Sequence, residues 1–253
     1  MSEFAGKTAL VTGASRGIGA AAAVALAQAG CARVLIHYGT YEEGAKRTLE
    51  AVEQTGAKGV LLQGQLESVE GIDDFLALLA PFARQINYLV SNAGSIVERA
   101  RLAEFTPELF DRVMNLNVKS LWFITQAVAP AMAERGDGAI VNVSSIAARN
   151  GGGNGSTVYA AAKAAVSAMT KGLAKELAPA GVRVNAISPG TVDNDFHVKF
   201  STREVLDGVA KATPQGRLST NEDMARVIVF LCSAAAGNVI GQTIEVNGGA
   251  YMI

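Results

Sequence analysis

Cysteine and histidine are scarce in this chain of 253 residues, which has two of each. Cys31 precedes an expected buried strand and Cys232 lies on an apolar helical stretch, so we expect both thiols to be buried and reduced, with no disulfide. His37 and His197 are far apart in the sequence and have no companions at ligand spacing. The sequence therefore predicts no metal site.

The chain also lacks an excess of one charge and a long apolar run. It has 22 basic and 23 acidic residues, and the basic residues form no cluster. This balance argues against nucleic acid or an anionic membrane as a partner. Apolar stretches such as residues 20–27 are too short to span a bilayer, and the N-terminus carries no signal-peptide pattern. We therefore expect a cytoplasmic protein that acts on a small molecule.

Apolar runs typical of strands alternate along the chain with longer helical patterns. Strands are expected over residues 8–12, 33–37, 59–63, 88–91, 139–144, 182–188 and 243–246. This alternation predicts an α/β fold in one domain over residues 1–253: a doubly wound Rossmann fold with a seven-stranded, mainly parallel sheet and helices on both faces. In such sheets ligands bind at the carboxyl ends of the strands.

Three glycines, Gly13, Gly17 and Gly19, follow the first expected strand and precede the alanine-rich helical stretch of residues 20–29. Glycines let the backbone approach a pyrophosphate, and the free amides at a helix N-terminus stabilise its charge. The spacing G-x-x-x-G-x-G differs from the commoner dinucleotide fingerprint G-x-G-x-x-G. The pattern still predicts a dinucleotide site.

Tyr159 and Lys163 stand four residues apart, and residues i and i+4 share one face of a helix. A nearby cation favours the phenolate, so we expect Lys163 to lower the pKa of Tyr159 toward the range useful for acid-base catalysis. A serine pair, Ser144 and Ser145, ends an expected strand upstream. These residues predict an active site.

These motifs together resemble the short-chain dehydrogenase/reductase family over almost the whole chain. TGASRGIG at residues 12–19 is similar to the family's cofactor motif, and SNAG at residues 91–94 to its NNAG motif. Asn117 matches the family's helix asparagine, Ser145 its catalytic serine, and Tyr159 with Lys163 its Y-x-x-x-K. RVNAISPG at residues 183–190 and GQTIEVNGG at residues 241–249 are similar to its last two strands and their turns.

The resemblance implies hydride transfer between a nicotinamide and a carbonyl or carbinol carbon. Ser145 would bind the substrate oxygen, Tyr159 would exchange the proton, Lys163 would bind the nicotinamide ribose, and Asn117 would hold a water. The resemblance and the strand pattern imply cofactor contacts at Gly13, Ser15, Arg16, Gly17, Ile18, Gly19, Tyr38, Gln65, Leu66, Asn92, Ala93, Gly94, Tyr159, Lys163, Pro189, Gly190, Val192 and Asn194.

Charge near the second expected strand favours NADP(H) over NAD(H). NAD-preferring folds usually place a carboxylate at the end of that strand, where this chain has Tyr38. Arg16 stands where NADP-preferring relatives often carry a basic residue, although Gly39 and Thr40 replace the usual second one. Two further positions depart from the family pattern: Gln65 stands for an adenine-contacting aspartate, and Asn194 for a nicotinamide-binding threonine.

Substrate identity follows least directly from the sequence. Residues 191–217 contain several charged side chains and are expected to form a lid. Either Arg149 or Arg99 could attract an anionic substrate, and the alternative is that each is a solvated loop arginine. The chain is expected to reduce a ketone. A 3-oxoacyl-carrier-protein reductase is the specific form of this expectation. The alternatives are an NAD-dependent sugar or alcohol dehydrogenase and a non-catalytic dinucleotide sensor.

Two apolar segments suggest self-association. Residues 120–132 are apolar around much of the expected helix, and residues 159–169 are rich in alanine, which permits close helix packing. A helix that is apolar beyond one stripe needs a second partner surface. Because the family commonly pairs these helices, we expect a homotetramer.

Overall fold

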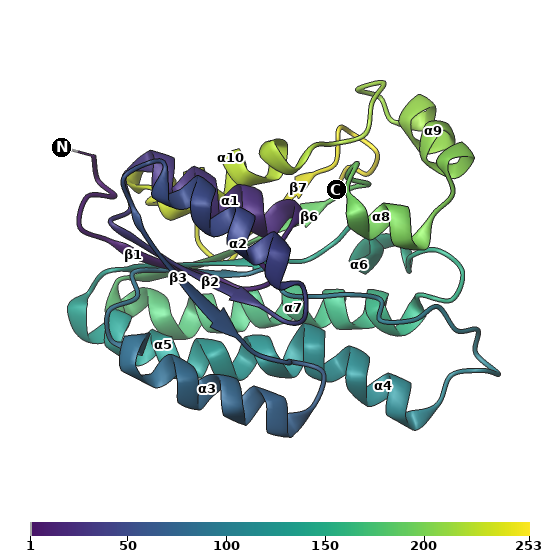
Figure 1. Cartoon of the computed structure of the whole chain (residues 1–253). Coiled ribbons are helices and arrows are strands. Elements are labelled where there is room, and N and C mark those ends of the chain that lie inside the picture. The colour runs from purple at the N-terminus through teal and green to yellow at the C-terminus, as the bar shows by residue number, and fades with distance from the viewer. Residues whose placement is uncertain (1) are drawn as a thin grey trace.

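The structure is a computed structural model that describes residues 2–253, without the side chains of residues 198 and 199. Across the described residues, seven parallel strands form one sheet in the order β3-β2-β1-β4-β5-β6-β7 (Figure 1). The strands are β1 (Thr8–Val11), β2 (Arg33–Tyr38), β3 (Lys58–Gln63), β4 (Tyr88–Ser91), β5 (Gly138–Val143), β6 (Val182–Pro189) and β7 (Thr243–Val246).

The central strands are continuous apolar runs, as expected for a sheet covered on both faces. Every residue of β1, β4 and β5 is buried. All seven expected strands are confirmed, and each begins and ends within one residue of its expected position. The strand order reverses between β1 and β4, which pair from Ala9 opposite Tyr88. A crevice for a ligand is expected at the carboxyl ends of these two strands.

Helices cover both faces of the sheet, as predicted (Figure 1). One face carries α1 (Gly17–Ala29), α2 (Glu42–Glu53) and α10 (Asn221–Cys232). The other carries α3 (Val69–Ala83), α5 (Ser120–Arg135) and α7 (Thr157–Leu177), with α4 (Pro107–Met114) joined to α5 through a π-helical turn, η1 (Asn115–Lys119). Two short 3₁₀ turns, η2 (Ala178–Ala180) and η3 (Ala234–Ala236), precede β6 and β7.

Three further helices lie beyond the carboxyl ends of the strands: α6 (Ala147–Asn150), α8 (Asp195–Phe200) and α9 (Arg203–Ala212) (Figure 1). The last two occupy most of the segment expected to form a lid. Asn194 caps α8 through its side-chain oxygen, and Thr202 caps α9. The segment is therefore helical, with a defined start to each helix.

Both cysteines are free thiols and buried, as expected, and burial raises the pKa of Cys31 to about 12. Within residues 2–253, no helix is long and apolar enough to cross a membrane.

Candidate active site

The predicted motifs meet around one cavity of about 600 Å³ at the carboxyl ends of the strands. They arrive from the ends of β1, β4, β5 and β6 and from α7. The predicted site residues that line the cavity are Gly13, Ser15, Arg16, Gly17, Ile18, Asn92, Ala93, Gly94, Ser145, Tyr159, Lys163, Pro189, Gly190, Val192 and Asn194. The topology thus brings together residues up to 181 positions apart, Gly13 and Asn194.

The loop between β1 and α1 has the close backbone packing that requires glycine. A Cβ on Gly19 would lie 2.3 Å from the Gly13 carbonyl oxygen and 2.5 Å from Nδ2 of Asn92. Asn92 Nδ2 donates to the carbonyl oxygens of Thr12 and Gly13 at 2.9 and 3.0 Å, which ties the loop to the end of β4. This compact cradle fits a pyrophosphate near the N-terminus of α1.

His37 supports the same loop from beneath, a role that the sequence analysis did not anticipate. Its Nδ1 accepts a hydrogen bond from the Gly13 amide at 3.0 Å, and Nε2 lies 3.1 Å from the Gly64 carbonyl oxygen. These partners assign the proton to Nε2. Burial lowers the pKa of His37 to about 4, so the ring is neutral and can accept from the loop.

Four predicted cofactor residues lie outside the cavity lining. Gly19 packs beneath the glycine loop. Tyr38 is buried at the end of β2, and Leu66 is buried beyond β3. Gln65 is exposed. Their roles at the adenosine end stay predictions.

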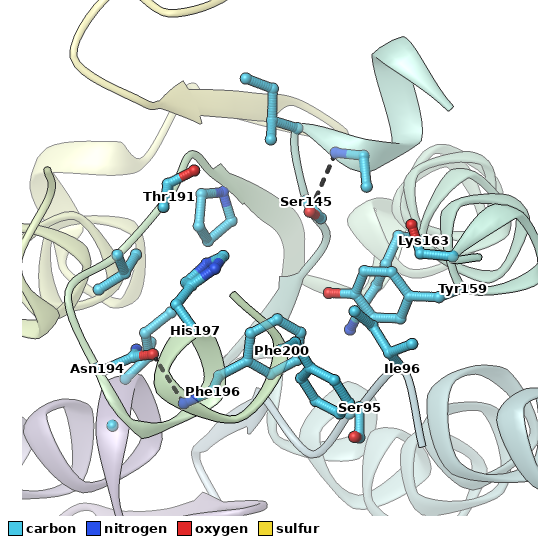
Figure 2. Close-up of a pocket in the computed structure, with 18 of the residues that line it drawn as sticks. Ser95, Ile96, Ser145, Tyr159, Lys163, Thr191, Asn194, Phe196, His197 and Phe200 are labelled. Carbon is cyan, nitrogen blue, oxygen red and sulfur yellow. Dashed lines mark hydrogen bonds between the residues drawn. The ribbon is translucent and has the colours of Figure 1, made fainter. Parts of the chain in front are cut away.

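Tyr159 and Lys163 lie on one face of α7, as the i, i+4 spacing predicts (Figure 2). Lys163 is buried, its Nζ donates to the Val143 carbonyl oxygen at 2.9 Å, and it lies 5.7 Å from the centre of the Tyr159 ring. Burial lowers the pKa of Lys163 to about 8. The two side chains therefore form a desolvated pair at the cavity wall.

The expected downward shift of the Tyr159 pKa is not found. Burial of the phenol raises its pKa to about 12, and a hydrogen bond with the Ser145 side chain opposes this rise. Desolvation disfavours the phenolate more strongly than its surroundings stabilise it. Tyr159 is accordingly a protonated donor in the structure.

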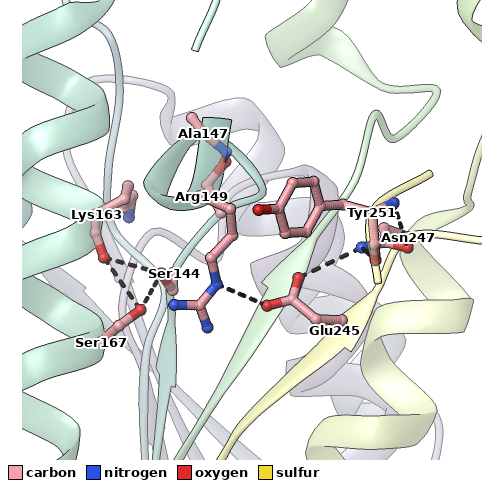
Figure 3. Close-up of polar contacts among 9 residues, drawn as sticks. Ser144, Ala147, Arg149, Lys163, Ser167, Glu245, Asn247 and Tyr251 are labelled. Atoms are coloured by element: carbon pink, nitrogen blue, oxygen red, sulfur yellow. Dashed lines mark hydrogen bonds and ion pairs between the residues drawn. The ribbon is translucent and has the colours of Figure 1, made fainter. Parts of the chain in front are cut away.

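The two serines have different surroundings, which separates their roles. The Ser144 hydroxyl is buried, donates to the Lys163 carbonyl oxygen at 2.9 Å and lies 2.8 Å from the Ser167 hydroxyl (Figure 3). Ser145 Oγ accepts from the Ala147 amide at 3.1 Å, and the Ser145 side chain lowers the pKa of Tyr159 against the effect of burial. Ser144 thus fixes α7, whereas Ser145 is the serine beside Tyr159.

Asn117 lies in the π-helical turn η1, which no pattern in the sequence indicated. Its Nδ2 donates to the carbonyl oxygens of Ser95 and Val113 at 2.9 and 2.8 Å. Its Oδ1 is buried and has no hydrogen-bond partner among the described residues. A Cβ on Gly94 would lie 2.7 Å from this Oδ1 and 2.8 Å from Lys163 Nζ, so the two atoms border one small space. That space suits a bound water.

Arg149 does not line the cavity, and it is neither the anion anchor nor the solvated loop arginine that were considered for it. Its Nε donates to Glu245 Oε1 at 2.8 Å, and both side chains are mostly buried (Figure 3). The ion pair holds the guanidinium against β7. Arg99, the other candidate, lines the cavity.

Arg47 was not anticipated as a site residue. It lies on α2 and donates to the Tyr41 hydroxyl, and its guanidinium is 5.3 Å from the centre of the Tyr41 ring. The Arg16 guanidinium is 5.2 Å from the same ring. A second basic side chain is therefore present beside the glycine loop, supplied by the helix that follows β2.

Asn194 uses both ends of its amide within the protein. Its oxygen accepts from the Phe196 amide at 3.2 Å, and its Nδ2 donates to Asn221 Oδ1 at 2.9 Å. It therefore connects α8 to α10 at the edge of the cavity. No group of three or more potential metal ligands occurs among the described residues.

Residues 13–251 match the family described as enoyl-(acyl-carrier-protein) reductase. The 3-oxoacyl-[acyl-carrier-protein] reductase of Pseudomonas aeruginosa is 37% identical over 251 residues, which cover 98% of each chain. A solved 3-oxoacyl-(acyl-carrier-protein) reductase from Agrobacterium tumefaciens, with NADP bound, has a TM-score of 0.88 and 31% identity, covering 97% of this chain and 95% of that one. A candidate NAD(P)-dependent gluconate 5-dehydrogenase from Beutenbergia cavernae, with bound NADP, has a TM-score of 0.89 and 35% identity over 97% of each chain.

Proposed function

Because the chain belongs to the short-chain dehydrogenase/reductase family, we propose that it reduces a ketone to a secondary alcohol with NADP(H). Its relatives in this family are NAD(P)-dependent enzymes that act on CH–OH and C=O groups. One observation carries the proposal. Ser145, Tyr159 and Lys163 line the same cavity as the glycine loop, so a proton donor and a dinucleotide cradle open onto one space.

The bound nicotinamide supplies the hydride, and the protein supplies orientation and the proton. Ser145 Oγ donates a hydrogen bond to the substrate oxygen, which polarises the carbonyl. Tyr159 gives its phenolic proton to the same oxygen as negative charge develops there. The protonated state of Tyr159 in the structure suits this direction of reaction.

The proton must then be replaced. Lys163 Nζ and Asn117 Oδ1 border one small space next to Gly94. A water held there by Asn117 can pass a proton toward Lys163 and onward to the phenolate. Lys163 also stabilises the phenolate electrostatically when it carries its charge.

The preference for NADP(H) rests on charge at the adenosine end. Tyr38 ends β2 and Gly39 and Thr40 follow it, at the place where a carboxylate would repel a 2′-phosphate. Arg16 and Arg47 both lie beside Tyr41 and offer positive charge. The two solved relatives described above contain NADP, which agrees with this preference.

Similarity to relatives supports one specific substrate class and one alternative to it. Identity to 3-oxoacyl-carrier-protein reductases supports a 3-oxoacyl substrate. Similarity to a candidate NAD(P)-dependent gluconate 5-dehydrogenase supports a sugar or alcohol dehydrogenase, but that relative contains NADP and gives no support to the NAD-dependent form. The remaining alternative, a dinucleotide sensor without turnover, does not fit a chain that belongs to a family of NAD(P)-dependent enzymes. We also propose that residues 191–217 act as a lid and that the single-domain chain works as a cytoplasmic homotetramer.

Replacement of Tyr159 by Phe tests the proposal. The variant should lose at least a hundredfold in turnover with a reducible ketone, because the phenol is the proton donor. Its Kd for NADPH, measured by nicotinamide fluorescence, should stay within about threefold of the parent, since the ring is retained. Phe230→Leu, on the exposed side of α10, is the matched aromatic control. Near-normal turnover of Tyr159→Phe would refute the assigned role.

A further inference from the structure

The part of the cavity beyond Tyr159 has an aromatic wall formed by α8. The Phe196 ring centre lies 6.1 Å from that of Tyr159, 5.1 Å from His197 and 5.2 Å from Phe200. The contacts of Phe196 with His197 and Phe200 are edge-to-face. Figure 2 shows Phe196 and Phe200 close to Tyr159 and Ile96, with His197 farther from Tyr159. The proton donor therefore faces a surface made of rings.

Aliphatic side chains complete this end of the cavity. Ile96 comes from the loop after β4, and Leu206 and Val209 come from α9. Ile96 and Leu206 are almost fully buried. The cavity lining thus includes apolar groups from three separate segments, together with the polar side chains of Ser95, Ser156 and Ser201.

Arg99, a cation at this end of the cavity, donates two hydrogen bonds to backbone carbonyl groups of the protein. Its Nε donates to the Phe200 carbonyl oxygen at 3.2 Å, and its Nη1 donates to the Asn154 carbonyl oxygen at 2.6 Å. It joins the end of α8 to the loop before α7. Burial and the charge of Arg99 lower the pKa of His197, and Asp193 opposes this shift. The net lowering favours the neutral ring.

Arg16 and Asp195 are 3.8 Å apart at the opposite, glycine-loop end of the cavity. A carboxylate on the substrate would have to use the N–H groups of Arg99 that its two backbone contacts leave free. Hydroxyl groups placed against Ile96, Phe196 and Leu206 would lose hydrogen bonds to water without replacement. An aromatic ring loses nothing of this kind and can pack edge-to-face with Phe196.

We propose that this pocket takes an uncharged ketone that carries an aromatic ring one carbon away from the carbonyl group. The ring packs against Phe196 and directs the carbonyl toward Ser145 and Tyr159. This inference rests on the proposed ketone reduction and narrows it. It disfavours keto sugar acids and short unbranched 3-oxoacyl groups as preferred substrates.

Two esters that differ by one ring provide the test. Ethyl 3-oxo-4-phenylbutanoate and ethyl 3-oxobutanoate have the same unconjugated ketone, so their intrinsic reactivities are close. With NADPH, kcat/KM for the phenyl ester should be at least tenfold higher, corresponding to about 1.4 kcal/mol. 5-Keto-D-gluconate should be reduced more slowly than either ester. Equal values for the two esters, or a preference for the keto acid, would overturn the inference while leaving ketone reduction intact.

Variants locate the effect in the aromatic wall. Phe196→Ala should reduce the preference for the phenyl ester at least fivefold through KM, and Phe196→Tyr should restore most of it. Phe230→Ala removes a partly exposed phenylalanine of α10 outside the cavity and should leave the preference unchanged. A Phe196→Ala variant with an unaltered preference would contradict the proposed position of the ring.

Calorimetry separates this inference from the proposed function. If the protein reduces no carbonyl compound, ketone reduction fails as its function. Binding of the two esters to the NADPH-loaded protein then decides the pocket on its own. A Kd at least tenfold lower for the phenyl ester supports the aromatic pocket, and equal Kd values overturn it.

Discussion

Tyr41 lies at the rim of the glycine loop beside two guanidinium groups, those of Arg16 and Arg47. All three side chains border a second cavity of about 620 Å³ between α1, α2 and α10. The close packing of Gly44 against the Ser15 carbonyl oxygen and the Tyr41 ring holds the start of α2 against the loop. Under the proposed preference for NADP(H), we expect these two positive charges to bind the 2′-phosphate that distinguishes it from NAD(H).

We expect the two arginines to contribute to this distinction separately. Arg16→Ala should raise the Kd for NADPH about tenfold or more, and Arg47→Met about threefold or more, because each removes a charge-assisted contact with the phosphate. The Kd for NADH should change less than twofold in both variants. Fluorescence titration with each nucleotide measures all four constants.

Lys46→Met is the matched control for Arg47, because Lys46 is the neighbouring cation of α2 and pairs instead with Glu42 at 3.0 Å. It should leave the NADPH Kd unchanged. Equal weakening of NADPH and NADH by Arg16→Ala would show that the arginine serves the loop and not the phosphate. If Lys46→Met weakens NADPH binding as much as Arg47→Met does, the loss reflects the overall charge of α2 and not a contact of Arg47 with the phosphate.

At the scale of elements, the contact between α6 and β7 is one that the sequence could not indicate. Arg149 and Glu245 are 96 positions apart, and their ion pair is extended by Asn247, whose Nδ2 donates to Glu245 Oε2 at 3.3 Å (Figure 3). Asn247 also donates to the Tyr251 carbonyl oxygen at 2.9 Å. The turn that follows Ser145 is thereby connected to the C-terminal segment.

Loss of this ion pair should destabilise the fold more than loss of a surface pair. Glu245→Gln leaves Arg149, with only 20% of its side chain exposed, without its countercharge. We expect a decrease of about 1–3 kcal/mol in the free energy of unfolding. Glu134→Gln breaks the exposed Arg84–Glu134 pair and should cost less than about 1 kcal/mol.

Urea denaturation of both variants at pH 7 compares the two losses directly. Equal effects would mean that Arg149 finds other partners or solvent when Glu245 loses its charge. Such a result would remove the argument that α6 is held in place by β7.

Over the whole molecule, the hydrophobic pattern was sufficient for the sheet but not for the side-chain geometry at its edge. Buried strands read as apolar runs bounded by turn residues, and parallel pairing follows from their alternation with helices. That logic yielded all seven strands and placed the glycine loop, Asn92 and Ser145 at one edge. The position of Tyr159 and Lys163 on one face of a helix follows from helical periodicity alone.

The remaining features depend on contacts that local patterns do not encode. The π-helical turn at Asn117 needs one extra residue in a helix, which has no sequence period of its own. Arg149 looked like a loop cation because its partner lies on the last strand. The shift in the Tyr159 pKa depends on how deeply the phenol is desolvated, which sequence spacing does not reveal.

Three large aromatic side chains of α4 and α5 remain partly exposed. Trp122 and Phe123 on α5 are 41% and 39% exposed, and Phe110 on α4 is 47% exposed. The opposite side of α5 packs Ile124 and Val128 into the core. Aromatic groups exposed together on neighbouring helices are characteristic of an interface between subunits.

We therefore expect Trp122→Glu to disrupt self-association, because it places a charge in the centre of that surface. Light scattering at micromolar concentration should report four chains for the parent and two or fewer for the variant. Leu78→Lys changes a similarly exposed apolar residue of α3 and should leave the mass at four chains. A monomeric parent would refute the homotetramer, whereas a tetrameric Trp122→Glu variant would place the contact elsewhere on the molecule.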